Sequence, residues 1–316
     1  MRTAFIAAMS TLAKSDRRVM LLTGDLGYSV FEKFQSEFPE QFLNCGVAEQ
    51  NMIGVAAGLA MSGKKVFVYS IVPFVTFRCL EQIRNDICYH DLAVCIVGVG
   101  GGYSYGTMGF SHHAMEDIAV MRSLPNMTVI CPGDPKEAEA AVGAINRLQK
   151  PCYLRLGKSG EPVVHVAPLA FEIGKAIEIV AGDDATIIAT STMLSTAMEV
   201  SARLTQKNIH AGVVSMHTVK PIDADALRRI TEKTRLLVTL EEHSAIGGLG
   251  SAVAEAMALG SMRPVRHLLL AAPDAFRSMA GSQKHLLSLA KLAPDDIAAS
   301  IEEAFRLPRT PFSNTQ

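Results

Sequence analysis

The sequence predicts an α/β fold made of two doubly wound domains with mainly parallel sheets. Short apolar runs rich in Val, Ile and Leu alternate with helical patterns, and such runs are typical of parallel strands buried on both faces. Two series of this kind are separated by a segment rich in Gly and Pro. The length of 316 residues suits about two domains of ordinary size.

The first domain is predicted over residues 1–165. It opens with an amphipathic helix in MRTAFIAAMSTLAKSDRR, which we favour over a signal peptide because no small-residue cleavage site precedes a polar segment. The predicted strands are RVMLLTG, KKVFVYSIV, LAVCIVGVG, MTVICPG and CYLRLG. A helix is predicted in PKEAEAAVGAINRLQK, after a Pro-Gly-Asp turn.

The segment GKSGEPVVHVAPLAFEIG predicts a linker, and the second domain is predicted over residues 172–307. Its predicted strands are DATIIATST, HAGVVSMHTV, RLLVTLEE and VRHLLLAA, with helices between them. The same alternation of strand and helix indicates a second parallel sheet.

Composition excludes several classes of function. The net charge of −1 provides no basic field for nucleic acid or an anionic membrane. No apolar run approaches the ~18 residues that a membrane span needs. The six cysteines show no Cys-x-x-Cys spacing, so we expect buried thiols in a reducing compartment and a cytoplasmic protein.

The stretch CGVAEQNMIGVAAGLAMSGKK places one carboxylate, Glu49, before about a dozen mostly small and apolar residues. A buried ionised group costs several kcal/mol or more unless it is paired or neutralised. Glu49 is therefore either a solvated residue at a helix start or a carboxylate kept for chemistry.

A Gly-Asp turn in LLTGDLGYS ends the first predicted strand, and Asn51 follows Asp25 by 26 positions. This spacing is similar to a Gly-Asp-Gly…Asn signature that binds Mg²⁺ and diphosphate. Leu26, however, replaces the third residue of the triplet, so we expect no metal site here. Asp25 and Leu26 are kept as candidate contacts to a cofactor.

Two further segments carry titratable residues. The glycine-rich loop VGVGGGYSYGTMGFSHH ends at His112 and His113, and so many glycines indicate sharp turns or a close backbone approach. Its spacing differs from the Gly-x-Gly-x-x-Gly pattern of dinucleotide sites. Glu241, Glu242 and His243 could suggest acid–base chemistry or a metal, but we favour a structural turn because no second ligand cluster has suitable spacing.

Four long motifs resemble the transketolase family of thiamine-diphosphate enzymes, and the resemblance covers nearly the whole chain. They are FPEQFLNCGVAEQNMIGVAAGLAMSGKKVFVYS, GFSHHAMEDIAVMRSLPNMTVICPGDPKEAEAAV, SMHTVKPIDADAL and TLEEHSAIGGLGSAVAEAMA. The family includes transketolase, 1-deoxyxylulose-5-phosphate synthase and the β subunits of oxo-acid dehydrogenases. The resemblance implies a pyrimidine-binding domain followed by a transketolase C-terminal domain.

The resemblance also implies roles for three residues at a cofactor site. In the family, the glutamate that matches Glu49 forms a hydrogen bond to a ring nitrogen of the aminopyrimidine and promotes loss of the thiazolium proton. A dry pocket strengthens such a bond. Phe74 and Phe77, in PFVTFRCLEQIRND, match the family's pyrimidine pocket and are candidates for stacking on the cofactor ring.

The substrate contacts implied by the resemblance fall at four positions. His112 matches the family's active-site histidine, whose imidazole can transfer protons near pH 7. Arg2, Ser29 and Lys158 match a set that contacts the sugar phosphate, with Lys158 at a position where the family has Arg.

Two positions depart from the family pattern. Met108 stands where an aspartate contacts the donor's hydroxyl group, and a phosphate-side histidine is replaced near Gly100. A thioether cannot act as the strong acceptor that a carboxylate is. We therefore expect a donor or acceptor pocket that differs from that of the ordinary pentose-phosphate enzyme.

Full-length transketolases begin with a diphosphate-binding domain that carries the Gly-Asp-Gly…Asn signature. The resemblance therefore implies the C-terminal subunit of a split transketolase, which binds thiamine diphosphate with Mg²⁺ ligands supplied by a separate N-terminal subunit. We expect self-association through the pyrimidine domain and sugar-phosphate substrates. Two alternatives stay open: a β subunit of a 2-oxo-acid dehydrogenase or deoxyxylulose-phosphate-synthase-like enzyme, and a non-catalytic partner subunit.

Overall fold

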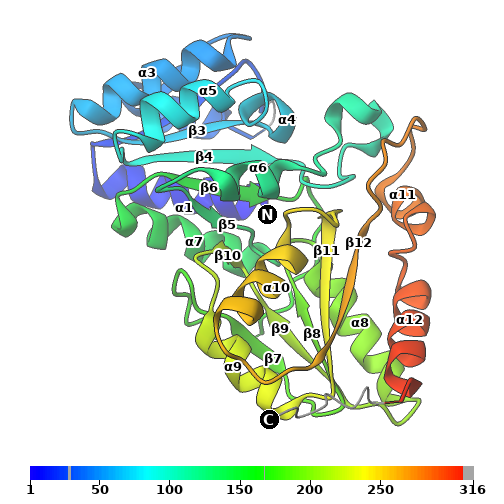
Figure 1. The fold of residues 1–316 in the computed structure, drawn as a ribbon. Coiled ribbons are helices and arrows are strands. Elements are labelled where there is room, and N and C mark those ends of the chain that lie inside the picture. Colours follow the sequence, from blue (N-terminus) through cyan, green and yellow to red (C-terminus); the bar gives the residue numbers. More distant parts are fainter. Residues whose placement is uncertain (28–29, 167, 309–316) are drawn as a thin grey trace.

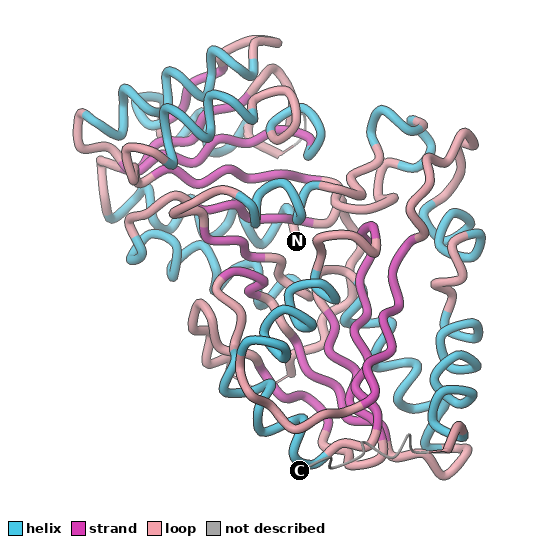
Figure 2. The backbone as a smooth tube through the Cα atoms, in the orientation of Figure 1, coloured by secondary structure: helices cyan, strands magenta, loops and turns pink. Residues whose placement is uncertain are grey.

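A computed structural model describes residues 1–27, 30–166 and 168–308. The chain forms two sheets, each with helices on both faces (Figure 1). The strands of the two sheets run in different directions, and they form two separate groups in the backbone view of Figure 2. The predicted fold class is confirmed, while the predicted domain limits at residues 165 and 172 stay a prediction.

The first sheet has seven strands in the order β10-β5-β6-β4-β3-β1-β2. All its neighbouring strands are parallel except β10 and β5, which are antiparallel. The strands of the first half are β1 (Val19–Thr23), β2 (Phe42–Asn44), β3 (Lys65–Ile71), β4 (Val94–Val99), β5 (Thr128–Ile130) and β6 (Cys152–Leu156).

Helices bury an apolar layer on each face of this sheet. Phe5, Met9 and Val142 belong to one layer, and Met52, Ile83 and Met121 belong to the other. In Figure 1, α1 and α7 lie on one side of the sheet and α3 and α5 on the other. The helical elements of this half are α1 (Arg2–Ser15), α2 (Glu32–Glu37), η1 (Pro39–Gln41), α3 (Glu49–Met61), α4 (Val72–Val75), α5 (Leu80–Gln82), a π-helical turn η2 (Ile83–Cys88), η3 (Gly106–Met108), η4 (Phe110–His112), α6 (Asp117–Ser123) and α7 (Pro135–Leu148).

The second sheet has five strands in the order β12-β11-β8-β9-β7, and only β7 runs antiparallel to its neighbour. Helices α8, α11 and α12 pack on one face, and α9 and α10 pack on the other. The helices and strands of the second half of the chain are β7 (Ile177–Val180), β8 (Ala185–Ala189), α8 (Met193–Thr205), β9 (Ala211–Ser215), β10 (Thr218–Lys220), α9 (Ala224–Lys233), β11 (Leu236–Ser244), α10 (Leu249–Leu259), β12 (Arg266–Ala272), α11 (Gln283–Leu289) and α12 (Pro294–Arg306). Of these strands, β10 belongs to the first sheet. No helix among the described residues is long and apolar enough to cross a membrane.

One predicted strand is wrong in its extent. HAGVVSMHTV forms two strands, because the chain leaves the second sheet after β9 and returns to the first sheet as β10. There β10 pairs with β5, so a strand from the second half closes the edge of the first sheet. The short strands β2 and β7 were not predicted. The linker prediction is correct for the described residues between β6 and β7, which contain no helix or strand.

A buried ion-pair network connects the two halves. Arg155 of β6 is fully buried, and its Nε lies 2.7 Å from Oδ2 of Asp117. Its Nη2 donates to the carbonyl oxygens of Ala114 and Glu242, at 2.9 and 3.0 Å. The Tyr153 hydroxyl donates to Asp117 at 2.6 Å. The charges of Arg155 and Asp117 are thus balanced by each other, which is the condition under which buried ions are tolerated.

The charged run from Glu241 to His243 is not a turn, because it forms the buried end of β11. Glu241 accepts hydrogen bonds from the amides of Leu249 and Gly250, at 2.7 and 2.8 Å, at the start of α10. Glu242 accepts from the amide of Tyr103 at 2.7 Å, across the boundary between the halves. These carboxylates bind backbone amides, and no cluster of three metal-binding side chains occurs within the described ranges.

Candidate active site

The predicted site residues gather at the carboxyl edge of the first sheet. Because β1, β3, β4 and β6 are parallel, the segments that follow them leave the sheet at the same edge. Asp25 follows β1, Phe74 follows β3, the glycine-rich loop follows β4 and Lys158 follows β6. Ligands of open α/β sheets bind at this edge.

Glu49 is the first residue of α3, and its side chain is 3 % exposed. Its Oε2 accepts a hydrogen bond from Nη1 of Arg78 at 2.7 Å. Its other oxygen has no hydrogen-bond partner within the described part of the chain. A Cβ at Gly24 would lie 3.4 Å from Cγ of Glu49, so the end of β1 packs against this side chain. The carboxyl group is therefore held in place with one oxygen unused.

Arg78 and Phe74 together connect Glu49 to His112. The guanidinium carbon of Arg78 lies 4.7 Å from the centre of the Phe74 ring, a cation–π distance. The His112 ring meets Phe74 edge to face, with ring centres 5.1 Å apart. Partial burial lowers the pKa of His112, so its imidazole is neutral at pH 7. Oγ of Ser111 lies 3.1 Å from Nδ1 of His112.

A second group of side chains lies beyond His112 and carries two cations. The Tyr105 ring is 6.3 Å from the His112 ring, and Nζ of Lys158 lies 4.9 Å from the centre of the Tyr105 ring. Burial raises the pKa of Tyr105, and the charge of Arg2 opposes that shift, so Arg2 is near the same phenol. The Nε of Arg2 is buried and has no partner among the described residues. Arg2 and Lys158 therefore both bring positive charge near Tyr105. Ser29 lies outside the described residues.

No group of three or more His, Cys, Asp or Glu side chains gathers at the Gly-Asp turn within the described chain. Asp25 has a positive φ of 54°, and its Oδ1 accepts a hydrogen bond from the Asn44 side chain at 3.0 Å. The carbonyl oxygen of Leu26 accepts from the Thr23 hydroxyl at 3.0 Å, and the Leu26 side chain packs on the apolar core. Contacts of Asp25 and Leu26 with a cofactor stay a prediction.

Two other predicted residues lie at the margin of the cluster. Met108 ends the short helix η3 and is 59 % exposed. Phe77 is half-buried and lines a cavity of about 180 Å³ where the two halves meet, together with buried His113 and Arg277. The structure therefore brings Glu49, Phe74 and His112 together and leaves Phe77 beside them.

Sequence reasoning did not identify Arg78 or Tyr105. Arg78 forms an ion pair with Glu49 and lies over the Phe74 ring. It directly follows Phe77 in the sequence. Tyr105 separates His112 from Lys158, and it lies in the glycine-rich loop that drew attention only for its glycines and histidines. An arginine with a 46 % exposed side chain has no sequence signal that sets it apart from a surface residue.

Comparisons with known proteins match both halves of the chain to one family. Residues 1–162 match the family model for the transketolase pyrimidine-binding domain, and residues 174–297 match the model for the transketolase C-terminal domain. The chain is 38 % identical to an apulose-4-phosphate transketolase subunit of Phocaeicola vulgatus, over 86 % of this chain and 87 % of that one. It is 36 % identical to the 6-deoxy-6-sulfo-D-fructose transketolase subunit SqwH of Clostridium sp., over 85 % and 84 %.

Solved structures extend the match to the fold. A split-gene transketolase, described as an inactive beta4 tetramer, superposes with a TM-score of 0.88 at 38 % identity and covers 98 % of both chains. A transketolase from Pichia stipitis superposes with a TM-score of 0.77 at 18 % identity, over 96 % of this chain and 45 % of that one, and shares the fold. The chain belongs to the transketolase family and has the two-domain organisation of the C-terminal subunit of a split transketolase.

Proposed function

We propose that this chain is one subunit of a thiamine-diphosphate-dependent transketolase that transfers a two-carbon ketol unit between phosphorylated sugars. The observation that carries the proposal is the buried Glu49 carboxyl group, which Arg78 links to Phe74 and His112 and whose second oxygen has no partner among the described residues. The relatives of similar length are named as transketolase subunits, which supports a division of the enzyme between two chains.

The residues present fit the aminopyrimidine half of the cofactor. The unused oxygen of Glu49 can bond to a ring nitrogen, and the Phe74 ring offers a stacking surface. When bound, thiamine diphosphate supplies the nucleophilic carbon that ketol transfer requires. The Mg²⁺ and diphosphate ligands are proposed to come from a separate N-terminal subunit, and cofactor contacts from Phe77, Asp25 and Leu26 are part of the same proposal.

Each residue of the cluster has a defined task in this proposal. Glu49 forms a hydrogen bond with the pyrimidine nitrogen, and burial excludes water that would compete for that bond. Arg78 keeps the carboxyl group in position through its ion pair. His112, neutral at pH 7, accepts a proton from a substrate hydroxyl group and returns it during the transfer.

The two cations beside Tyr105 are proposed to bind the far end of the sugar. Arg2 and Lys158 provide two cations near Tyr105, and a phosphate group carries the matching charge. Ser29 is proposed to add a hydroxyl contact. Met108 is exposed at the margin of the site, where it replaces the acceptor that reads a donor hydroxyl in the ordinary enzyme. We therefore propose altered donor selectivity.

The assembly proposed is two copies of each subunit in the cytoplasm, with self-association through the pyrimidine domain. Closed two-fold interfaces are the commonest solution for such oligomers. The test is to purify this chain alone and then with its N-terminal partner, supply thiamine diphosphate and Mg²⁺, and assay ketol transfer. We expect no transfer by the chain alone and transfer by the pair. Full activity of the chain alone would contradict the division of the site between two subunits.

A further inference from the structure

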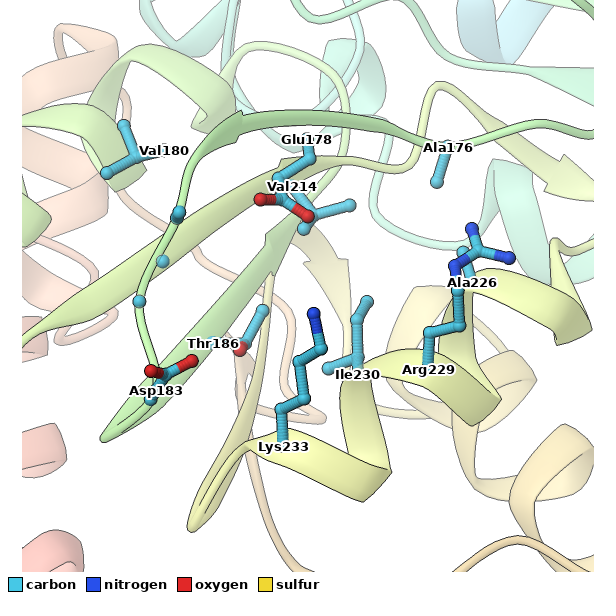
Figure 3. Close-up of a pocket in the computed structure, with 13 residues that line it drawn as sticks. Ala176, Glu178, Val180, Asp183, Thr186, Val214, Ala226, Arg229, Ile230 and Lys233 are labelled. Carbon is cyan, nitrogen blue, oxygen red and sulfur yellow. The ribbon is translucent and has the colours of Figure 1, made fainter.

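A hollow on the second domain lies far from the Glu49 cluster and contains none of its residues (Figures 1 and 3). It has a volume of about 140 Å³, and it lies between strand β7, the loop that follows it, and helix α9. One liquid water occupies about 30 Å³, so the hollow has room for a small ligand of several heavy atoms. The apolar part of its wall comes from Val180, Val214 and Ile230.

Four charged side chains surround this hollow, two of each sign. Arg229 and Lys233 are four residues apart on α9, which places them on one face of the helix. Glu178 extends from β7 and Asp183 from the loop after it. Figure 3 shows Lys233 extending between Thr186 and Ile230 toward the space below Glu178.

None of these four side chains forms an ion pair or hydrogen bond within the part of the chain that the structure describes. Their neighbours behave differently, because Arg228 lies 3.1 Å from Asp225, Lys175 lies 3.6 Å from Asp225 and Arg235 lies 3.7 Å from Asp184. Opposite charges on this surface thus pair wherever they can reach each other. The four charged side chains around the hollow form no such pair within the described residues.

The backbone fixes the position of the loop that follows β7. A Cβ at Gly182 would lie 2.3 Å from the amide nitrogen of Gly212, so the loop after β7 rests directly on β9. This contact holds Asp183 on the strand side of the hollow, while α9 holds the two cations opposite. Thr186 is buried in the floor, where its hydroxyl can donate to an anionic group.

We propose that this hollow binds a small zwitterion, an α-amino acid with an aliphatic side chain. Its carboxylate would bind Arg229, Lys233 and the Thr186 hydroxyl, and its ammonium group would bind Glu178 and Asp183. The side chain would pack on Val214 and Ile230. A simple anion satisfies the two cations but meets two carboxylates without counter-charge, whereas a zwitterion complements both pairs.

Calorimetric titration of the full chain tests this with L-alanine, L-valine and L-leucine as probes. We expect at least one to bind with a dissociation constant of about 1 mM or lower. Isovalerate, which lacks the amine of valine, and isobutylamine, which lacks its carboxylate, should each bind about tenfold more weakly than valine. The readout is heat of binding, so its failure is distinct from a failure of the proposed ketol transfer.

Matched variants place the binding in this hollow. Lys233→Met and Glu178→Gln should each weaken amino-acid binding about tenfold, and both side chains are exposed, so the variants should fold normally. Arg228→Met is the control on the same helix, because Arg228 pairs with Asp225 instead of lining the hollow. The proposal is overturned if none of the three amino acids binds, if isovalerate or inorganic phosphate binds as tightly as valine, or if Lys233→Met binds like the control.

Discussion

Glu49 and Asp117 are both buried carboxylates of the first domain, but their surroundings differ. Asp117 accepts hydrogen bonds from Arg155 and Tyr153, and all three side chains are fully buried. Among the described residues, Glu49 has one partner, Arg78, whose side chain is 46 % exposed. The first group is saturated by its neighbours and holds the halves together. The second keeps an oxygen unused at the edge of the sheet, which suits it to bind something that the chain itself does not supply.

The largest effect on activity is expected at Glu49. Glu49→Gln keeps the size and one hydrogen bond but removes the proton that the carboxyl group can hold, and loss of one acid–base role lowers turnover by about 10²–10⁴-fold. Steady-state kinetics on the reconstituted two-chain enzyme would measure this. The melting temperature should stay near that of the wild type, because Gln satisfies the same buried position. A large fall in melting temperature would assign Glu49 to the folded core instead.

The largest effect on stability is expected at Arg155. Arg155→Met removes one partner of a buried pair and leaves the Asp117 charge uncompensated, a change that costs about 3–5 kcal/mol. Urea denaturation of the isolated chain would measure the loss. If Arg155→Met were as stable as the wild type while Glu49→Gln unfolded, the contrast between the two carboxylates would be reversed.

A smaller effect is expected at Met108, which separates this site from that of the ordinary enzyme. Met108→Asp restores a strong acceptor at the site margin, so kcat/KM for xylulose 5-phosphate as donor should rise about tenfold. The comparison requires a panel of donors with wild type and variant. Efficient use of xylulose 5-phosphate by the wild type, with no change in Met108→Asp, would show that Met108 does not set donor choice.

The smallest effect on stability is expected at two other buried carboxylates, Asp134 and Glu137, which contact the linker. Nδ1 of His165 lies 3.1 Å from Asp134, and its Nε2 lies 3.4 Å from Glu137. The Asp134 carboxylate beside its ring raises the pKa of His165, and Glu137 acts in the same direction. The charge of His165 also lowers the pKa of His217 in the second half, although burial of His217 is the larger cause.

The sign of the pH dependence follows from the raised pKa of His165. Its stabilisation is complete below the unfolded pKa near 6.5 and is lost as pH rises through the folded pKa. The melting temperature of the wild type relative to His165→Gln should therefore fall as the pH rises above about 6.5. A melting-temperature difference that stays constant or grows as the pH rises would show that the charge of His165 does not stabilise the fold.

The sequence was sufficient for the central strands of the first sheet, and it named Glu49, Phe74 and His112 as candidate site residues. Buried parallel strands are continuous apolar runs, so β3, β4 and β6 were visible. The passage of the chain from β9 to β10 was not, because its residues are apolar in both sheets and only tertiary pairing separates them. Arg78 was missed because its ion pair joins segments 29 residues apart.

The charged end of β11 illustrates the opposite error. Three titratable residues in a row favour a turn when only local solvation is considered, but the amides at the start of α10 and of Tyr103 satisfy Glu241 and Glu242 inside the protein. Such partners come from distant segments and leave no local pattern. Sequence therefore indicates which carboxylates are unusual, and the structure distinguishes the saturated ones from Glu49.

Glu49 is proposed to promote loss of a proton from the cofactor. The most direct test is hydrogen–deuterium exchange at the thiazolium carbon of thiamine diphosphate, followed by NMR in the reconstituted two-chain enzyme. We expect exchange in Glu49→Gln to be slower by about 10²–10⁴-fold than in the wild type, while a control substitution on α9, Arg228→Met, leaves it unchanged. Exchange in Glu49→Gln at the wild-type rate would contradict the assignment.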